Sequence, residues 1–190
     1  MEPLAWLRVP ATDELPDDLQ AFFATAEEKL GHVPNVFRVF SLSPKHFQLW
    51  FRYYDYLMRD EEASALSRAE REMIAVAVSS ENRCEYCLAS HGAYLRELEP
   101  DHVKTDLIAH NYRRADLSER ERVILDFAVR MTTGSHPMSP ADLGPLRAAG
   151  LSDEAIFEVA QVAAMFNFTN RLGNALGWRP NERYYTAQRP

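Results

Sequence analysis

The stretch Leu66–Leu95, LSRAEREMIAVAVSSENRCEYCLASHGAYL, decides the class of fold. Ser67 is followed three residues later by Glu70, and this capping box predicts a helix that runs to about Val78. Apolar residues recur at helical rather than alternating spacing along the rest of the chain, and Gly and Pro are sparse in its interior. The sequence therefore predicts an all-α protein.

A second helix is expected after the polar run SSEN. Ser80 and Asn82 are both good N-cap residues, so this helix is predicted to begin just before Cys84. On a helix with 100° per residue, Cys84, Cys87 and His91 fall within about 60° of one another and share one face. Both cysteines then lie near the helix N-terminus, where the dipole and free N–H groups lower a thiol pKa. His91, one turn beyond Cys87, is within reach as a proton partner.

Glu72 precedes Cys84 by twelve residues, which is about 18 Å along an uninterrupted helix. It joins the cysteines only if the chain turns back near SSEN, whose composition suits a turn. A glutamate on the preceding helix then faces the two thiols as a general acid or base.

Other helices are marked by similar signals. They are expected from about Asp17 to Gly31, over the aromatic segment 44–60, from the capping box at Ser118, and from Ser152. In the segment 44–60, Phe47, Trp50, Tyr54 and Leu57 form an apolar stripe that is expected to be core.

The capping boxes at Ser67 and Ser118 are 51 residues apart, and further matches at this offset suggest an internal repeat. The second copy lacks the cysteines. The expected organisation is a single all-α domain over residues 1–190, with a first half at about 17–100 that carries both cysteines, a degenerate second half at about 117–178 and a C-terminal arm at 179–190.

Composition narrows the function classes. The 190 residues are 46% hydrophobic and carry a formal net charge of −7, with no basic run interleaved with aromatic residues, so nucleic acid and anionic membranes are poor partners. No apolar run approaches the roughly 20 residues of a spanning helix, and the N-terminal segment is acidic without a signal-peptide core. We expect a cytoplasmic protein, in which two close cysteines indicate catalysis, redox chemistry or a metal rather than a structural disulfide.

Three interpretations of the cysteine pair remain. The pair is a redox dithiol, a metal clip, or two small buried helix residues. A structural zinc site takes four protein ligands, and only Cys84, Cys87 and His91 are in reach, with Glu72 a poor fourth, so we expect no bound metal and no cofactor. Asn170, late in a predicted helix, is interpreted as structural.

The spacing Glu72, eleven residues, Cys84-x-x-Cys87, three residues, His91 resembles the core motif of the alkylhydroperoxidase D family, within the carboxymuconolactone decarboxylase-like superfamily. The segments GHVPNVFRVFSLSP, LSERERVILDFA and FNFTNRLGNALGW further resemble its uncharacterised peroxidase-related branch, so the likeness covers nearly the whole chain.

This resemblance implies a thiol peroxidase that reduces a small-molecule hydroperoxide. Cys87 would be the peroxidatic thiolate, Cys84 the resolving thiol, and Glu72 with His91 the proton relay. An external dithiol or protein would regenerate the pair, and the chain would form a homo-oligomer, a trimer or a dimer-based hexamer. One departure is Tyr86, because the best-known family members carry a second histidine there.

Two alternatives stay open. The first is a general dithiol-disulfide oxidoreductase whose oxidant is a disulfide. The second is a non-enzymatic redox or metal sensor that changes its assembly state.

Overall fold

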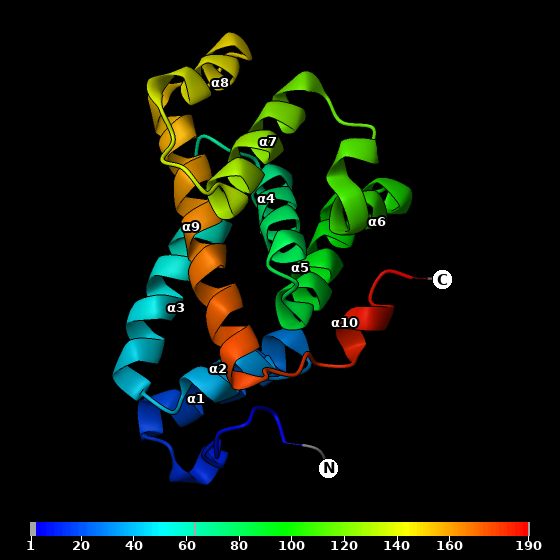
Figure 1. Ribbon diagram of the computed structural model, residues 1–190. Helices are drawn as coiled ribbons and strands as arrows, with labels where there is room; N and C mark the ends of the chain where they lie inside the picture. Colours follow the sequence, from blue (N-terminus) through cyan, green and yellow to red (C-terminus); the bar gives the residue numbers. More distant parts are fainter. Residues whose placement is uncertain (1–2, 63, 190) are drawn as a thin grey trace.

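The computed structural model describes residues 3–62 and 64–189, and all the regular structure within them is helical, as the sequence predicts (Figure 1). The α-helices are α1 (Asp17–Leu30), α2 (Asn35–Phe40), α3 (Pro44–Arg59), α4 (Arg68–Glu81), α5 (Glu85–Leu98), α6 (His102–Asn111), α7 (Glu119–Thr133), α8 (Gly144–Ala148), α9 (Asp153–Leu176) and α10 (Arg183–Thr186). Short 3-10 turns are η1 (Thr12–Glu14), η2 (Tyr112–Arg114) and η3 (Pro140–Leu143). None of these described helices combines the length and apolar character that crossing a bilayer requires.

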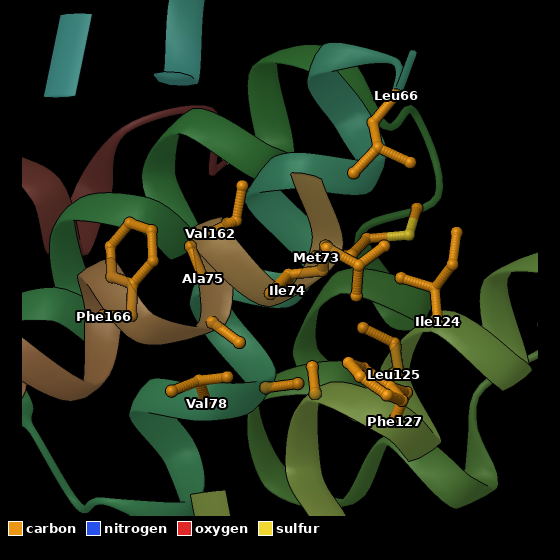
Figure 2. Close-up of a cluster of buried hydrophobic side chains, with 14 of the residues drawn as sticks. Leu66, Met73, Ile74, Ala75, Val78, Ile124, Leu125, Phe127, Val162 and Phe166 are labelled. Carbon is orange, nitrogen blue, oxygen red and sulfur yellow. The ribbon is translucent and has the colours of Figure 1, made fainter. Parts of the chain in front are cut away.

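Helix α4 forms the centre of the core. It packs against α5, α6, α7 and α9, and its residues are buried without interruption from Arg71 to Ser79. A helix that is apolar on all sides is stable only when other helices surround it. Figure 2 shows Ile74 of α4, Leu125 of α7 and Val162 of α9 as members of one buried cluster. The positions of the α4 side chains from Arg71 to Ser79, including Glu72, are therefore fixed by packing.

The predicted helix termini are confirmed where a capping residue determines them. Helix α1 ends at Gly31, whose φ of 69° is left-handed backbone that glycine adopts without strain. Ser67, Ser118 and Ser152 each accept a hydrogen bond at the start of α4, α7 and α9, as expected.

The turn between α4 and α5 differs from the prediction. Helix α4 continues to Glu81 rather than Val78, and the N-cap of α5 is Cys84 itself, not Ser80 or Asn82. The hydroxyl of Ser80 donates instead to the carbonyl of Ala109 (2.6 Å), and Asn82 ends α4. Arg83 then takes a left-handed φ of 53°, which reverses the chain. The expected fold-back occurs, three residues later than the sequence indicates.

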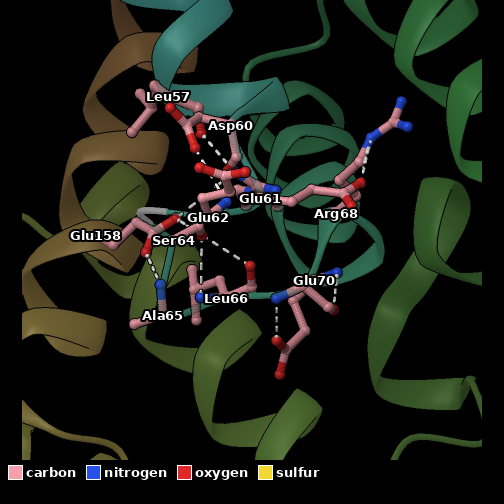
Figure 3. Close-up of polar contacts among 12 residues, drawn as sticks. Leu57, Asp60, Glu61, Glu62, Ser64, Ala65, Leu66, Arg68, Glu70 and Glu158 are labelled. Carbon is pink, nitrogen blue, oxygen red and sulfur yellow. Dashed lines mark hydrogen bonds and ion pairs between the residues drawn. The ribbon is translucent and has the colours of Figure 1, made fainter.

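A polar cluster fixes the start of α4 (Figure 3). The carboxylate of Glu158 accepts a hydrogen bond from the backbone N–H of Ala65 (2.8 Å) and another from the hydroxyl of Ser64. Arg71, only 1% exposed, donates to the carbonyls of Leu57 (3.2 Å) and Asp60 (2.7 Å). The end of α3 and the start of α4 are thereby tied together.

The internal repeat stays a prediction. Helix α7 begins at the second capping box, as α4 does at the first. At the same offset, however, the positions that correspond to α5 hold η3 and the five-residue α8. The two halves therefore share the capped helix and not the helix that carries the cysteines.

The C-terminal arm packs on its own chain. It contains the one-turn helix α10, where the sequence shows no helical period, and this helix lies against α5 (Figure 1). Arg96 of α5 is 8% exposed and donates to the carbonyls of Tyr184 (2.8 Å) and Ala187 (3.0 Å). Tyr185 also donates to Glu85 of α5 (2.6 Å), and Tyr184 packs on Ala89 and Ala93, so the guanidinium is one of several contacts that hold the arm to α5.

We expect Arg96→Met to loosen the arm, since hydrogen bonds from a charged group contribute about 1.5–3 kcal/mol each. Amide hydrogen exchange across 183–189 should accelerate at least tenfold, with exchange in α4 unchanged. Arg189→Met is the matched control, because Arg189 makes only a half-exposed ion pair with Asp106 (2.8 Å). Equal exchange in the Arg96 variant and the wild type would contradict the assigned role.

Candidate active site

Glu72 and His91 form the pair expected from the sequence. Glu72 lies on α4 and His91 on α5, and Nδ1 of His91 donates to Oε2 of Glu72 at 2.7 Å. The two residues are 5% and 6% exposed, so solvent screens this contact weakly. The His91 ring packs edge-on against Phe166, with centroids 4.5 Å apart. Its tautomer and orientation are thereby fixed, and Nε2 is left as the ring nitrogen for proton transfer.

Both cysteines are free thiols, 1% and 3% exposed. The pKa of Cys84 is lowered, first by a hydrogen bond from the Cys87 thiol and then by the backbone N–H groups of Cys87 and Tyr86, while burial opposes the shift. Cys84 lies at the N-cap of α5, where such N–H groups are free to donate. The first thiolate of the pair therefore forms at Cys84.

The pKa of Cys87 is raised. This corrects the expectation that the helix N-terminus lowers the pKa of both thiols. The hydrogen bond to Cys84 raises it most, followed by burial and by the negative charge of Cys84. Two adjacent thiols cannot both ionise easily, so a single helix N-terminus stabilises one charge at the expense of the other. Cys84 and Cys87 consequently behave as one unit that shares a proton.

Asn170 belongs to the site, although sequence analysis assigned it a structural role. This α9 residue is fully buried, and its side-chain hydrogen bonds lower the pKa of both thiols. Its amide also donates to the hydroxyl of Ser79 (3.0 Å) and accepts from Asn82 (3.0 Å). The available sequence signal was the polar run NFTNR, in which Asn167 and Asn170 lie three residues apart after an apolar stretch. Thr169 beside it lowers the pKa of Cys87 as well.

A cavity of about 30 Å³ lies beside the dithiol, and Cys87 and His91 line it while Cys84 does not. Since one water occupies roughly 10–15 Å³ on this measure, the cavity admits a molecule of a few heavy atoms. Most of its wall is aromatic: Phe37, Trp50, Tyr54, Tyr86, Tyr94, Phe166, Trp178 and Tyr184. A small ligand in this cavity therefore contacts the sulfur of Cys87 and not that of Cys84.

Tyr86 occupies the position of the second family histidine but does not replace it as a base. Burial raises its pKa well above the ordinary value, so the phenol stays neutral. Its hydroxyl oxygen accepts a hydrogen bond from the backbone N–H of Val36 (3.0 Å), and its ring contacts Trp178 edge-on. Tyr86 therefore connects α5 to α2.

Within residues 3–62 and 64–189, no group of three or more His, Cys, Asp or Glu side chains is arranged to hold a metal ion. The chemistry available at the site is that of two thiols, an imidazole and a carboxylate.

An all-α fold with a buried Cys-x-x-Cys pair and a Glu–His contact defines a class of dithiol proteins. The sequence model of the carboxymuconolactone decarboxylase family matches residues 44–99, which include all four of these side chains. The chain belongs to this family and to its alkylhydroperoxidase D-like members.

Two solved structures carry this assignment. An uncharacterised peroxidase-related protein from Ralstonia eutropha, with an alkylhydroperoxidase D core, is 38% identical over 100% of this chain and 99% of its own, with a TM-score of 0.94. A peroxidase-related protein from Silicibacter is 41% identical over 99% and 97%, with a TM-score of 0.93. The debrominase Bmp8, 21% identical over 97% and 95% with a TM-score of 0.76, shares the fold. Comparison with curated proteins found no match.

Asn170→Ala should raise the pKa of the first thiol to ionise, because it removes a hydrogen bond of about 0.5–1.5 kcal/mol from the Cys84 thiolate. The thiolate fraction at neutral pH should fall roughly twofold to tenfold, measured by absorbance at 240 nm during a pH titration. Gln161→Ala, another amide on α9 that donates to Tyr53 (3.0 Å), is the control. An unchanged midpoint in Asn170→Ala would remove Asn170 from the site.

Proposed function

We propose that the protein is a thiol peroxidase that reduces hydroperoxides through Cys87 and Cys84. The observation that carries this proposal is the cavity shared by Cys87 and His91, with His91 already oriented by Glu72. A thiol, a proton carrier and room for a small molecule are the parts that such a reaction needs.

The first step oxidises Cys87. His91 takes the proton of Cys87, and the Glu72 carboxylate stabilises the imidazolium that results. The thiolate sulfur attacks the terminal oxygen of ROOH, so that the S–O bond forms while the O–O bond breaks. The departing RO⁻ then takes the proton from His91, leaving the alcohol and Cys87 sulfenic acid. The raised pKa of Cys87 makes this proton transfer harder and the sulfur more nucleophilic once ionised.

The second step is resolution by Cys84. The backbone N–H groups of Cys87 and Tyr86 and the amide of Asn170 still stabilise the Cys84 thiolate once Cys87 is oxidised. Its attack on the sulfenic sulfur forms the disulfide and releases hydroxide, which is protonated to water. An external dithiol then reduces the disulfide by exchange. The opposite pKa directions therefore suit two roles: Cys87 meets the peroxide and Cys84 resolves.

The test is a stopped-flow titration of the reduced protein with hydrogen peroxide and an alkyl hydroperoxide, followed by mass spectrometry of the Cys84/Cys87 peptide. We expect rapid formation of the intramolecular disulfide, abolished in Cys87→Ser. Glu72→Gln should slow it by roughly tenfold to a thousandfold, because general acid–base catalysis contributes about 10²–10⁴.

Glu81→Gln, at the exposed end of α4, is the matched control and should react at the wild-type rate. Full peroxide turnover by Cys87→Ser would overturn the assignment of the attacking thiol. Disulfide exchange much faster than peroxide oxidation in the wild type would favour the general dithiol-disulfide oxidoreductase instead.

We also propose that the chain assembles as a homo-oligomer, a trimer or a dimer-based hexamer. A groove of about 580 Å³ is walled by apolar residues of α3 and α9 together with Leu7 and Leu42. Several are well exposed: Leu7 46%, Leu42 41%, Leu49 58% and Phe168 50%. Contiguous apolar surface of this kind is typical of protein interfaces, and a second copy of the chain would cover it.

Leu49→Glu is expected to dissociate the assembly, because it places a charge on the covered face. Size-exclusion chromatography with light scattering should show the wild type as an oligomer and this variant as a smaller species, whereas Val103→Glu, at an equally exposed apolar position on α6, should leave the mass unchanged. A monomeric wild type would overturn the proposal.

A further inference from the structure

A second cavity, of about 460 Å³, lies between α5, α6 and the C-terminal arm. Its volume is in the range of small-molecule sites, and its wall shares only Tyr184 with the cavity beside Cys87. The charged and titratable residues that line it are Arg83, Glu85, Arg96, Asp106, His110 and Arg189. This cavity is therefore a separate site with a different chemical character.

Arg96 brings a charge to this cavity that protein groups satisfy only in part. The residue is 8% exposed, and its Nε and Nη2 atoms donate to the carbonyls of Ala187 and Tyr184. Its Nη1 atom makes no hydrogen bond within residues 3–62 and 64–189, and it is not one of the polar atoms buried there without a partner. Gly92 lies one turn earlier in the same wall, and a Cβ there would be 3.5 Å from Nη1. The missing side chain at Gly92 thus leaves Nη1 open to the cavity.

The charges around Arg96 leave an excess of one positive charge. Burial and the charge of Arg189 lower the pKa of Arg96, while Asp106 opposes this, so both residues act on the same guanidinium. Arg189 and Asp106 form an ion pair (2.8 Å), and a guanidinium stays charged in proteins. At the opposite end of α5, Arg83 and Glu85 balance each other. With His110 neutral, the cavity has a net charge of one, on a chain whose formal net charge is −7.

The hydroxyl groups of the wall do not compete for this role. Those of Ser80, Thr105 and Tyr184 each have a protein partner, and that of Tyr185 donates to Glu85 (2.6 Å). The aliphatic part of the wall consists of Leu88, Ala89 and Ala109. A ligand that fits this cavity therefore has an anionic group for Arg96 and an apolar body.

We propose that this cavity binds a small organic carboxylate, with the carboxylate at Nη1 of Arg96 and the apolar body against Leu88 and Ala89. Guanidinium N–H groups form strong, charge-assisted hydrogen bonds with carboxylate oxygens. A single negative charge matches the local excess at Arg96, whereas a dianion exceeds it and is repelled by Asp106. The site lies apart from the thiols, so this proposal does not depend on the peroxidase function.

The binding test titrates the full-length, ¹⁵N-labelled protein with sodium benzoate and follows its backbone amide signals. We expect saturable shifts at Leu88, Gly92 and Arg96. Benzamide has the same shape without the charge, and it should bind at least tenfold more weakly because it loses the charge-assisted hydrogen bond. Shifts that do not saturate with benzoate, or equal binding of benzamide, would overturn the proposal. Tighter binding of phenyl phosphate than of benzoate would refute the choice of a singly charged ligand.

Two variants locate the site. Gly92→Leu places a side chain beside Nη1 and should abolish benzoate binding. Asp106→Asn removes a repelling carboxylate and frees Arg189, so it should tighten benzoate binding about twofold to fivefold, a gain that misfolding does not produce. Asp55→Asn is the matched control, because Asp55 forms a similarly exposed ion pair with Arg59 (3.3 Å) on α3. Unchanged or weaker binding in Asp106→Asn, or wild-type binding in Gly92→Leu, would contradict the assignment.

Discussion

The hydrogen bond between Glu72 and His91 is the contact on which the site depends. It joins α4, which is buried from Arg71 to Ser79, to α5, which carries Cys87 and begins at the N-cap Cys84. Removing the imidazole would leave the buried Glu72 carboxylate without compensation, a change that costs about 3–5 kcal/mol. The same 2.7 Å contact fixes the orientation of the His91 imidazole at the cavity beside Cys87. One hydrogen bond therefore both stabilises the packing of α4 against α5 and orients the group that transfers the proton.

Much of the fold was predictable because its signals are local. The serines that cap α4, α7 and α9, and the glycine that ends α1, act within one helical turn of themselves. The end of α4 was mispredicted because it depends on partners remote in the sequence. Ser80 and Asn82 are good N-cap residues in isolation, yet α6 and α9 provide the acceptors that hold their side chains at the end of α4.

The sequence predicted which four residues lie together at the site, but it did not predict the pKa directions of the two thiols. Spacing alone brought Cys84, Cys87, His91 and Glu72 together. The order of acidity of the two thiols depends on their mutual hydrogen bond, and the pKa of both is lowered by Asn170, which lies more than eighty residues further along the chain. No helical periodicity contains that information, because it arises only when α9 packs across the turn between α4 and α5.

The cavity beside Cys87, too, could not be predicted from local sequence signals. Its walls come from α2, α3, α5, α9, Trp178 and α10, so no contiguous stretch of sequence encodes it. More than half of these side chains are aromatic, and a wall of this kind strengthens the electrostatic interactions inside it by excluding water. The few polar atoms that face such a space then decide what binds there. The carboxylate of Glu72 orients His91 at the cavity, and the charge of Cys84 raises the pKa of Cys87, so two groups outside the cavity act on the thiol and the imidazole that line it.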